Sequence, residues 1–240
     1  MVGGMGRRNK HRIICALDTG DLEVALASVR KLREFCGAFK IGHALTLPNG
    51  LEVIDRLQDA GAERVFLDLK FHDIPSSVGI AVREAAKHKV WMMTLHLSGG
   101  PAMLSAAAEE AKMVTVSDRP MLVGVSVLTS MDQKTLSDDL GVGRTIEEHM
   151  VHLSELGMRA GIDGVVCSVH EAAALRAALP HQAVLVTPGI RANHGESHDQ
   201  TRIGDGRDAI TAGADYMVIG RALTEAADPE QALNDLRLCD

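Results

Sequence analysis

Short apolar runs alternate with longer segments of helical period along almost the whole chain. The longer segments include 21–35, 51–61 and 171–179, in which apolar residues recur every three to four positions. Asp21 is a helix start signal, whereas Gly61 and Pro180 end their segments. Apolar runs separated by helical segments are typical of parallel βα units. The eight predicted strands are 12–18, 38–42, 64–69, 90–97, 121–129, 164–169, 183–189 and 215–220.

Two α/β architectures fit eight such units, and the first turn distinguishes them. A doubly wound sheet should carry G-x-G-x-x-G after its first strand. Here the first strand is followed by Asp18-Thr19-Gly20-Asp21. We therefore predict an α/β protein with a (β/α)8 TIM barrel. Residues 1–11 are expected to form a flexible tail and residues 12–240 a single catalytic domain, because no linker-like stretch divides them.

Composition narrows the functional classes. A hydrophobic fraction of 46% and a charged fraction of 24% are ordinary for a globular protein. The formal charge of −7, without a basic stripe, argues against a nucleic-acid partner. No apolar run reaches membrane-spanning length, and the start MVGGMGRRNKH lacks the apolar region of a signal peptide. The cysteines at 15, 36, 167 and 239 form no C-x-x-C pair, so a reducing, cytoplasmic location without membrane association is expected.

The most informative charges follow the third apolar run. Asp68 and Lys70 are two positions apart, so in a strand they point to the same face, and Asp73 follows just before Pro75. A surface ion pair would explain these charges, but the preceding run is apolar enough to be buried on both faces. Pro75 fits the first position of a helix, which places Asp73 one residue too early to be its N-cap. These charges indicate an active site.

Other polar residues stand at predicted strand ends, where barrel enzymes carry their chemistry. Lys40 lies inside an apolar strand, where an unpaired ammonium is costly, and Asp68 on the next strand is its obvious partner. Singly, several of the others have structural explanations: Asp18 and Ser98 as helix caps, His96 as a buried imidazole. Read together, they favour a site that includes Asp18, Lys40, Asp68, Lys70, Asp73, His96, Ser98, Thr129 and Ser130.

The last two strands end in glycine–arginine pairs, Gly189-Ile190-Arg191 and Gly220-Arg221. Backbone N–H groups beside a guanidinium suit a phosphate, and barrels often bind phosphate after strands 7 and 8. Between the pairs lies a long polar stretch, 192–202, which suggests a lid whose Gln200 adds an amide donor.

The residues suggest two alternative chemistries, metal binding and Schiff-base formation. His149 with His152 and His194 with His198 have ligand-like spacing, but they lack the context of a known metal motif, so no metal site is predicted. A barrel lysine can form a Schiff base. However, Asp68 and Asp73 bracket Lys70 and favour its charged form, which suits proton donation.

Together, these motifs resemble those of the orotidine 5′-monophosphate decarboxylase family, and the resemblance extends over residues 12–227. D-x-K-x-x-D-I-P matches 68–75, L-T-S matches 128–130, P-G-I-R matches 188–191 and V-I-G-R matches 218–221. The family's early Asp and Lys match Asp18 and Lys40, and its lid glutamine matches Gln200. The resemblance implies cofactor-free conversion of the substrate to uridine 5′-monophosphate and CO2, the last step of de novo pyrimidine nucleotide synthesis.

The resemblance also implies a role for each matching residue. Asp68 would lie against the leaving carboxylate and Lys70 would protonate C6, with Lys40 and Asp73 completing the catalytic set. Asp73, Ile74 and Ser77 would reach the partner's site in a homodimer. The substrate would be bound by Asp18 and Lys40 at the ribose, Thr129 and Ser130 at the pyrimidine, and Arg191, Gln200, Gly220 and Arg221 at the phosphate.

The chain departs from the family's sequence pattern in two places, and three alternative functions remain. Ser76-Ser77 replaces the family's usual Asn-Thr, and strand 2 continues into residues 43–46, His-Ala-Leu-Thr, instead of Glu-Leu-Phe. One alternative is a metal-dependent keto-gulonate-phosphate decarboxylase, but those enzymes resemble each other in a strand-2 glutamate where this chain has Lys40. The others are a phosphosugar lyase or aldolase and a non-catalytic phosphate-binding barrel.

Overall fold

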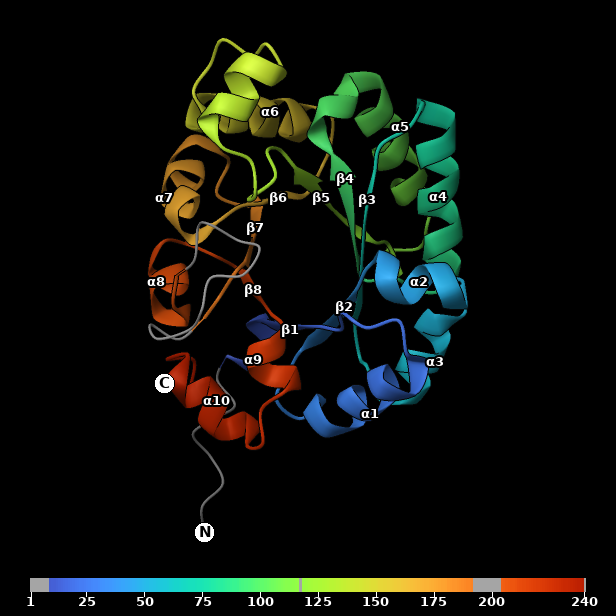
Figure 1. Ribbon diagram of the computed structural model, residues 1–240. Coiled ribbons are helices and arrows are strands. Elements are labelled where there is room, and N and C mark those ends of the chain that lie inside the picture. The colour runs from blue at the N-terminus through green and yellow to red at the C-terminus, as the bar shows by residue number, and fades with distance from the viewer. Residues whose placement is uncertain (1–8, 117, 192–203, 240) are drawn as a thin grey trace.

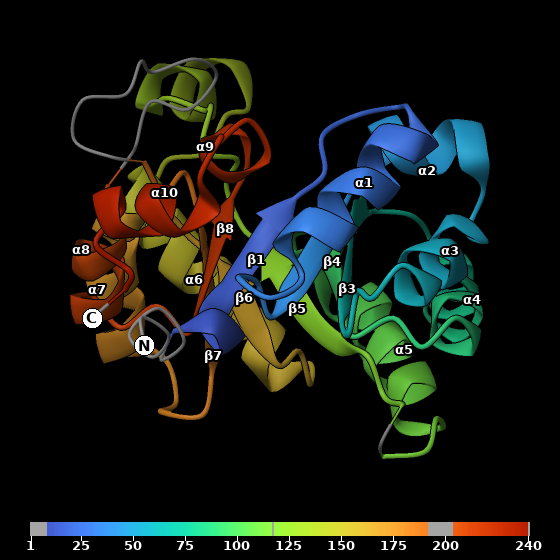
Figure 2. The ribbon, with the colours of Figure 1, turned by 90° about the horizontal axis from the view of Figure 1, so that it is seen from below.

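The structure is a computed structural model that describes residues 9–116, 118–191 and 204–239. Within these residues, eight parallel strands pair in sequence order and close into a barrel, with β1 against β8. Figures 1 and 2 show the strands at the centre and the helices around them. The predicted TIM barrel is confirmed. Its strands are β1 (Ile13–Ala16), β2 (Ala38–Ile41), β3 (Val65–Phe71), β4 (Met92–His96), β5 (Met121–Val125), β6 (Gly164–Val166), β7 (Val184–Pro188) and β8 (Tyr216–Ile219).

Helices connect and cover the strands. Short turns of other helix types also occur: η1 (Lys10–Arg12), η2 (Leu97–Gly99) and the π-helical η3 (Thr135–Asp139). The α-helices are α1 (Leu22–Leu32), α2 (His43–Asn49), α3 (Val53–Asp59), α4 (Pro75–Lys87), α5 (Gly100–Lys112), α6 (Ile146–Arg159), α7 (Val169–Ala178), α8 (Gly206–Thr211), α9 (Arg221–Thr224) and α10 (Pro229–Asp235).

Element boundaries follow local capping chemistry. The Asp21 carboxylate accepts hydrogen bonds from the backbone N–H groups of Glu23 and Val24, at 2.9 and 3.2 Å, which confirms the predicted start of α1. The predicted strand 164–169 ends early, at Val166, because Ser168 is the N-cap of α7. The strand predicted at 121–129 likewise ends at Val125. Helix α2 was not predicted: its segment, 43–49, follows β2 directly.

The barrel interior explains why the site lies at one end. An apolar cluster fills the interior, and a polar layer lies above it. Because strand side chains alternate faces, the inward position after Phe66 is Asp68, and the one after Met92 is Thr94. The same step leads from Ala38 to Lys40. The apolar cluster consists of Ile14, Ala16, Ala38, Phe66, Met92, Val123, Val186 and Val218.

The two ends of the described chain lie close together. The Asn9 side-chain Nδ2 donates a hydrogen bond to the Leu238 carbonyl oxygen at 3.1 Å. Residues 1–8 of the predicted tail lie outside the described residues, so the division into tail and domain stays a prediction. No helix in the described part of the chain has both the length and the apolar character needed to cross a membrane.

Candidate active site

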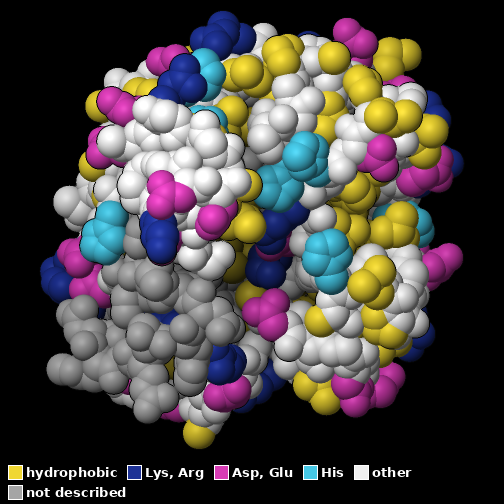
Figure 3. Space-filling model, turned by 45° about the horizontal axis from the view of Figure 1, so that its top comes forward, with side chains coloured by type: hydrophobic (Ala, Val, Ile, Leu, Met, Phe, Trp, Pro, Cys, Tyr) yellow, Lys and Arg dark blue, Asp and Glu magenta, His cyan; other side chains and the backbone are white. Residues whose placement is uncertain are grey.

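A cleft opens at the carboxyl ends of the strands. Its volume is about 1040 Å3, and it is lined by residues of β1, β2, β3, β5, β6, β7 and β8 and of segments that follow several of these strands. Figure 3 shows basic and acidic side chains gathered in a hollow near the middle of this face, with histidines at its rim. Barrel enzymes place their chemistry at this end.

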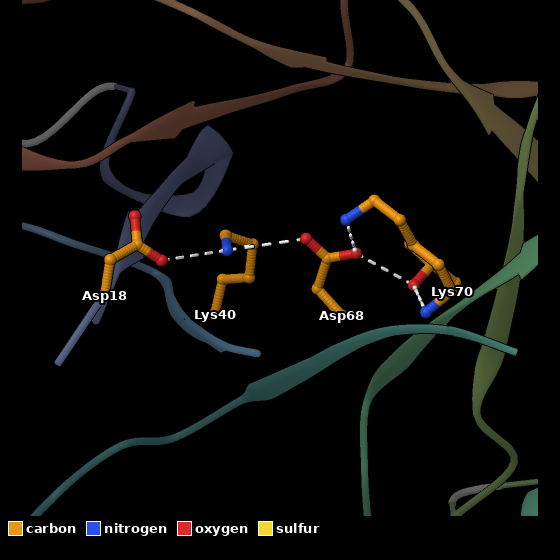
Figure 4. Close-up of polar contacts among 5 residues, drawn as sticks. Asp18, Lys40, Asp68 and Lys70 are labelled. Atoms are coloured by element: carbon orange, nitrogen blue, oxygen red, sulfur yellow. Dashed lines mark hydrogen bonds and ion pairs between the residues drawn. The ribbon is translucent and has the colours of Figure 1, made fainter. Parts of the chain in front are cut away.

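Four charged side chains, from β2, β3 and the segment after β1, form a row of alternating sign (Figure 4). The Lys40 Nζ lies 3.3 Å from the Asp18 Oδ1 and 3.4 Å from the Asp68 Oδ2. The Lys70 Nζ lies 2.9 Å from the Asp68 Oδ1. The ion pair between Lys40 and Asp68 that the sequence predicts is therefore present. The row places two ammonium groups on either side of one carboxylate.

Burial differs along the row. The side chains of Asp68 and Lys40 are only 13% and 14% exposed, whereas that of Asp18 is 68% exposed. Burial raises the pKa of the Asp68 carboxyl, but the charges of Lys40 and Lys70 and hydrogen bonds from Lys70 and Thr94 outweigh it. The pKa of Asp68 is held below its ordinary value, so the carboxylate is ionised at neutral pH.

The backbone of β3 is irregular where Lys70 lies. Its register against β4 passes from Leu67 opposite Met93 to Phe71 opposite Leu95, so β3 advances four residues while β4 advances two. Lys70 has a φ of 50°, in the left-handed region that residues with a Cβ seldom adopt. Asp68 and Lys70 meet, as the alternation of strand side chains predicted, but the irregular register and the left-handed Lys70 shape this strand end.

Thr94 is a residue of the site that the sequence did not predict. Its hydroxyl accepts a hydrogen bond from the Lys70 backbone N–H at 2.8 Å and donates one to the Asp68 Oδ1 at 2.9 Å. A period-two reading of 90–97 would have found it, because Thr94 is a hydroxyl residue two positions after the inward-facing Met92.

Residues of the predicted phosphate and base sites line the same cleft: Thr129, Arg191, Gly220 and Arg221. Gly189 has a φ of 81°, which glycine adopts without strain, and Gly220 is the N-cap of the short helix α9. Gln200 lies outside the described residues. The cleft therefore has a row of charges on one wall and guanidinium groups at the ends of β7 and β8.

Several predicted residues are not brought to this cleft. The Asp73 carboxylate accepts a hydrogen bond from the Ile74 backbone N–H at 2.6 Å, and both residues are exposed. Ile74, which is 63% exposed, is the N-cap of α4, as expected if Asp73 is not. Ser77 lies in the first turn of α4, and Ser130 is exposed. Among the described residues, none of these four lines the cleft.

Histidines lie close to Lys70, and one of them was not predicted. The rings of His72 and His96 are 5.3 Å apart between centroids. Burial, and then the charges of His72 and Lys70, lower the pKa of His96, so its imidazole is neutral near pH 7. In the described ranges, no three His, Cys, Asp or Glu side chains gather as metal ligands would. His194 and His198 fall outside those ranges.

Comparison with known proteins gives one consistent result. A model described as the Orotidine 5'-phosphate decarboxylase / HUMPS family matches residues 11–236. The orotidine 5'-phosphate decarboxylase of Aliivibrio fischeri (strain MJ11) is 45% identical over 229 residues, which cover 95% of this chain and 96% of the relative. The orotidine 5'-phosphate decarboxylase of Chromobacterium violaceum is 42% identical over 226 residues, covering 94% and 90%.

The solved structures agree on the fold. The crystal structure of orotidine 5'-phosphate decarboxylase from Lactobacillus acidophilus superposes with a TM-score of 0.80 at 28% identity, and the match covers 94% of this chain and 96% of that one. The two relatives described above are more than 40% identical over nearly the full length of both chains, so they support membership of the family as well as a shared fold. The chain belongs to the orotidine 5'-phosphate decarboxylase / HUMPS family.

Proposed function

We propose that the chain decarboxylates orotidine 5′-phosphate to uridine 5′-phosphate and CO2, the last step of pyrimidine nucleotide synthesis. The observation that carries this proposal is the row Asp18–Lys40–Asp68–Lys70 in a cleft that arginines also line. A phosphate-binding barrel would need the arginines alone. Because desolvation can offset the Coulombic gain of a buried ion pair, the buried Asp68 between two ammonium groups is better explained by chemistry than by stability.

One wall of the cleft binds the phosphate of the substrate, and the charged row on the other wall binds its ribose and carboxylate. The phosphate binds to Arg191 and the Gly220–Arg221 turn, with Gln200 added from the segment after β7. Asp18 and Lys40 hold the ribose hydroxyls as acceptor and donor. Thr129, which lines the cleft, contacts the edge of the pyrimidine. The C6 carboxylate then lies at the Asp68–Lys70 end of the row.

Asp68 destabilises the bound carboxylate. Its lowered pKa keeps it charged when the substrate arrives. Two unit charges about 4 Å apart repel by about 4 kcal/mol at an effective dielectric near 20. Relief of that repulsion as CO2 leaves corresponds to roughly a thousandfold in rate.

Lys70 completes the reaction. When the bond between C6 and the carboxyl carbon breaks, its electron pair stays on C6, and the Lys70 ammonium stabilises this charge. The Lys70 Nζ then transfers a proton to C6, which leaves a neutral amine that solvent reprotonates. Before the reaction the Lys70 Nζ contacts the Asp68 Oδ1 at 2.9 Å, which holds the ammonium beside the site of the leaving carboxylate.

The functional unit is inferred to be a homodimer. Asp73 and Ile74 are exposed outside the cleft of their own chain, which leaves both side chains accessible to a second chain. In the proposed dimer, Asp73, Ile74 and Ser77 enter the partner's site. A cytoplasmic location is part of the proposal, supported by four free cysteines.

The proposal is tested by following the loss of orotidine 5′-phosphate absorbance together with CO2 release. We expect turnover without any cofactor, and full activity after exhaustive chelation. Activity that falls on chelation and returns with magnesium would assign the chain to the metal-dependent sugar-phosphate relatives. Binding of the nucleotide without CO2 release would leave only a phosphate-binding barrel.

A further inference from the structure

Thr94 lies at the junction of the two residues that we assign to chemistry. It lies in β4, is 1% exposed, and faces the barrel interior above Met92. Its hydroxyl oxygen is 2.9 Å from the Asp68 Oδ1 and 2.8 Å from the Lys70 backbone nitrogen. We propose that Thr94 is a positioning residue that holds Asp68 and Lys70 in their reactive arrangement. This inference rests on the proposed function and deepens it.

The direction of both hydrogen bonds follows from their partners. The Lys70 backbone N–H can only donate, and the ionised Asp68 carboxylate can only accept. The Thr94 hydroxyl must therefore accept from Lys70 and point its proton at Asp68. The Thr94 hydroxyl thus connects the Lys70 backbone to the Asp68 carboxylate, which the Lys70 side chain also contacts.

The hydrogen bond from the Lys70 backbone N–H to Thr94 matters because the backbone of β3 is irregular at Lys70. Lys70 is held at a φ of 50°, between the register Leu67–Met93 and the register Phe71–Leu95. Its N–H has left the regular ladder, so the Thr94 hydroxyl supplies the partner that the ladder does not. Without that partner the strand end would relax, because L residues disfavour this conformation. The Lys70 ammonium would move with the backbone that carries it.

Asp68 is fixed from three sides. Its Oδ2 contacts the Lys40 Nζ, whereas its Oδ1 is shared between the Lys70 Nζ and the Thr94 hydroxyl. Loss of the hydroxyl would let the carboxylate rotate toward either ammonium. A reacting group displaced by about 1 Å can lose roughly a hundredfold in rate. The arginines at the ends of β7 and β8 would keep their places, because Thr94 contacts neither.

The test compares Thr94→Val, which keeps the side-chain shape without the hydroxyl, with Thr94→Ser, which keeps the hydroxyl. We expect Thr94→Val to lower kcat by roughly 10- to 100-fold, which is about 1.4 to 2.7 kcal/mol. Its Kd for uridine 5′-phosphate should stay within about twofold of the parent, since phosphate binding dominates product affinity. Thr94→Ser should recover most of kcat.

Thr187→Val is the matched control. Thr187 lies in β7, is 0% exposed, and its hydroxyl is 3.8 Å from the Cys167 Sγ. Its neighbours Val186 and Pro188 line the cleft, so Thr187 faces the helices instead. The same buried substitution there should leave kcat unchanged. Thr94→Ala replaces Thr94→Val in the comparison with Thr94→Ser if the valine variant does not fold.

Three results would overturn the role of Thr94. Thr94→Val could retain the parental kcat, Thr94→Ser could lose as much kcat as Thr94→Val, or kcat and nucleotide affinity could fall together. Failure of the proposed function is distinguishable from each of these, because the parent protein would then release no CO2.

Discussion

Lys70 combines a charged side chain with a backbone conformation that few L residues adopt. Its φ of 50° lies at the irregular end of β3, and its Nζ contacts Asp68 at 2.9 Å. Strained backbone persists where surrounding contacts over-determine it, and it concentrates at functional sites. At the scale of single residues, Lys70 therefore combines an unfavourable backbone conformation with the side-chain position that the proposed reaction needs.

A pair of substitutions separates chemistry from binding. Lys70→Ala removes the proton donor, so kcat should fall by roughly a hundred- to ten-thousandfold. Uridine 5′-phosphate should still bind, because the proposed phosphate contacts lie at the ends of β7 and β8. Arg221→Ala should instead weaken nucleotide binding about ten- to a hundredfold, as expected for a lost hydrogen bond to a charged group. Steady-state kinetics and calorimetric titration measure the two effects.

Arg159→Ala is the control for charge removal, since Arg159 ends α6 with a side chain that is 66% exposed. It should change neither quantity. Equal loss of kcat and affinity in both site variants would show that the division of roles between the two walls is wrong.

At the scale of elements, the start of α8 depends on one buried carboxylate. Asp205 is 1% exposed, and its two oxygens have separate partners. The Oδ1 accepts from the Asp208 backbone N–H at 2.8 Å, which makes Asp205 the N-cap, and the Oδ2 contacts the Arg237 Nη1 at 2.8 Å. The same residue therefore begins a helix and ties it to the end of the described chain.

Asp205→Ala removes the N-cap and the charged hydrogen bond from Arg237, whose side chain is 45% exposed, so we expect the free energy of unfolding to fall by about 3 kcal/mol. Asp205→Asn should cost less, because asparagine is a good N-cap. Asp228→Ala is the comparison at an exposed N-cap, that of α10, and should cost about 1 kcal/mol. Urea denaturation gives the three values. If the alanine and asparagine variants of Asp205 were equally destabilised, the cap would contribute nothing.

At the scale of the whole molecule, the proposed dimer makes each site depend on two chains. Two-fold symmetry makes the sites equivalent in the parent. A Lys70→Ala subunit paired with an Asp73→Ala subunit would have one site with both defects and one with neither. With equal, random exchange about half the dimers are mixed, so activity should recover to about a quarter of the parent. Each variant alone should be nearly inactive, and the mixture is measured by CO2 release.

Mixing Lys70→Ala with Asp68→Ala provides the control, because Asp68 and Lys70 contact each other within one chain. Every site in that mixture carries at least one defect, so no activity should return. If the Lys70→Ala and Asp73→Ala mixture also recovered nothing, Asp73 would not act in the partner's site.

The sequence predicted the barrel and several local features correctly, because each depends on neighbours along the chain. Alternating apolar runs and helical segments follow from the two side-chain periodicities. Capping chemistry within a few residues makes Asp21 the N-cap of α1. It also excludes Asp73 as the N-cap of α4, because Pro75 is the first residue of that helix and Ile74 precedes it. The charges at 68–73 also stood out in the sequence as a candidate site.

Beyond the Lys40–Asp68 pair and the Asp68–Lys70 contact, which the sequence predicted, tertiary structure decided how the site is assembled. Pairing between strands brings Asp18, Lys40 and Asp68 into one row, and the register shift against β4 gives Lys70 its left-handed backbone. The same pairing places the Thr94 hydroxyl against both Asp68 and Lys70. Register and backbone strain are set by contacts between residues far apart in sequence, which local periodicity does not encode. The chain thus specifies its charges locally, whereas the closed barrel determines which of them act together.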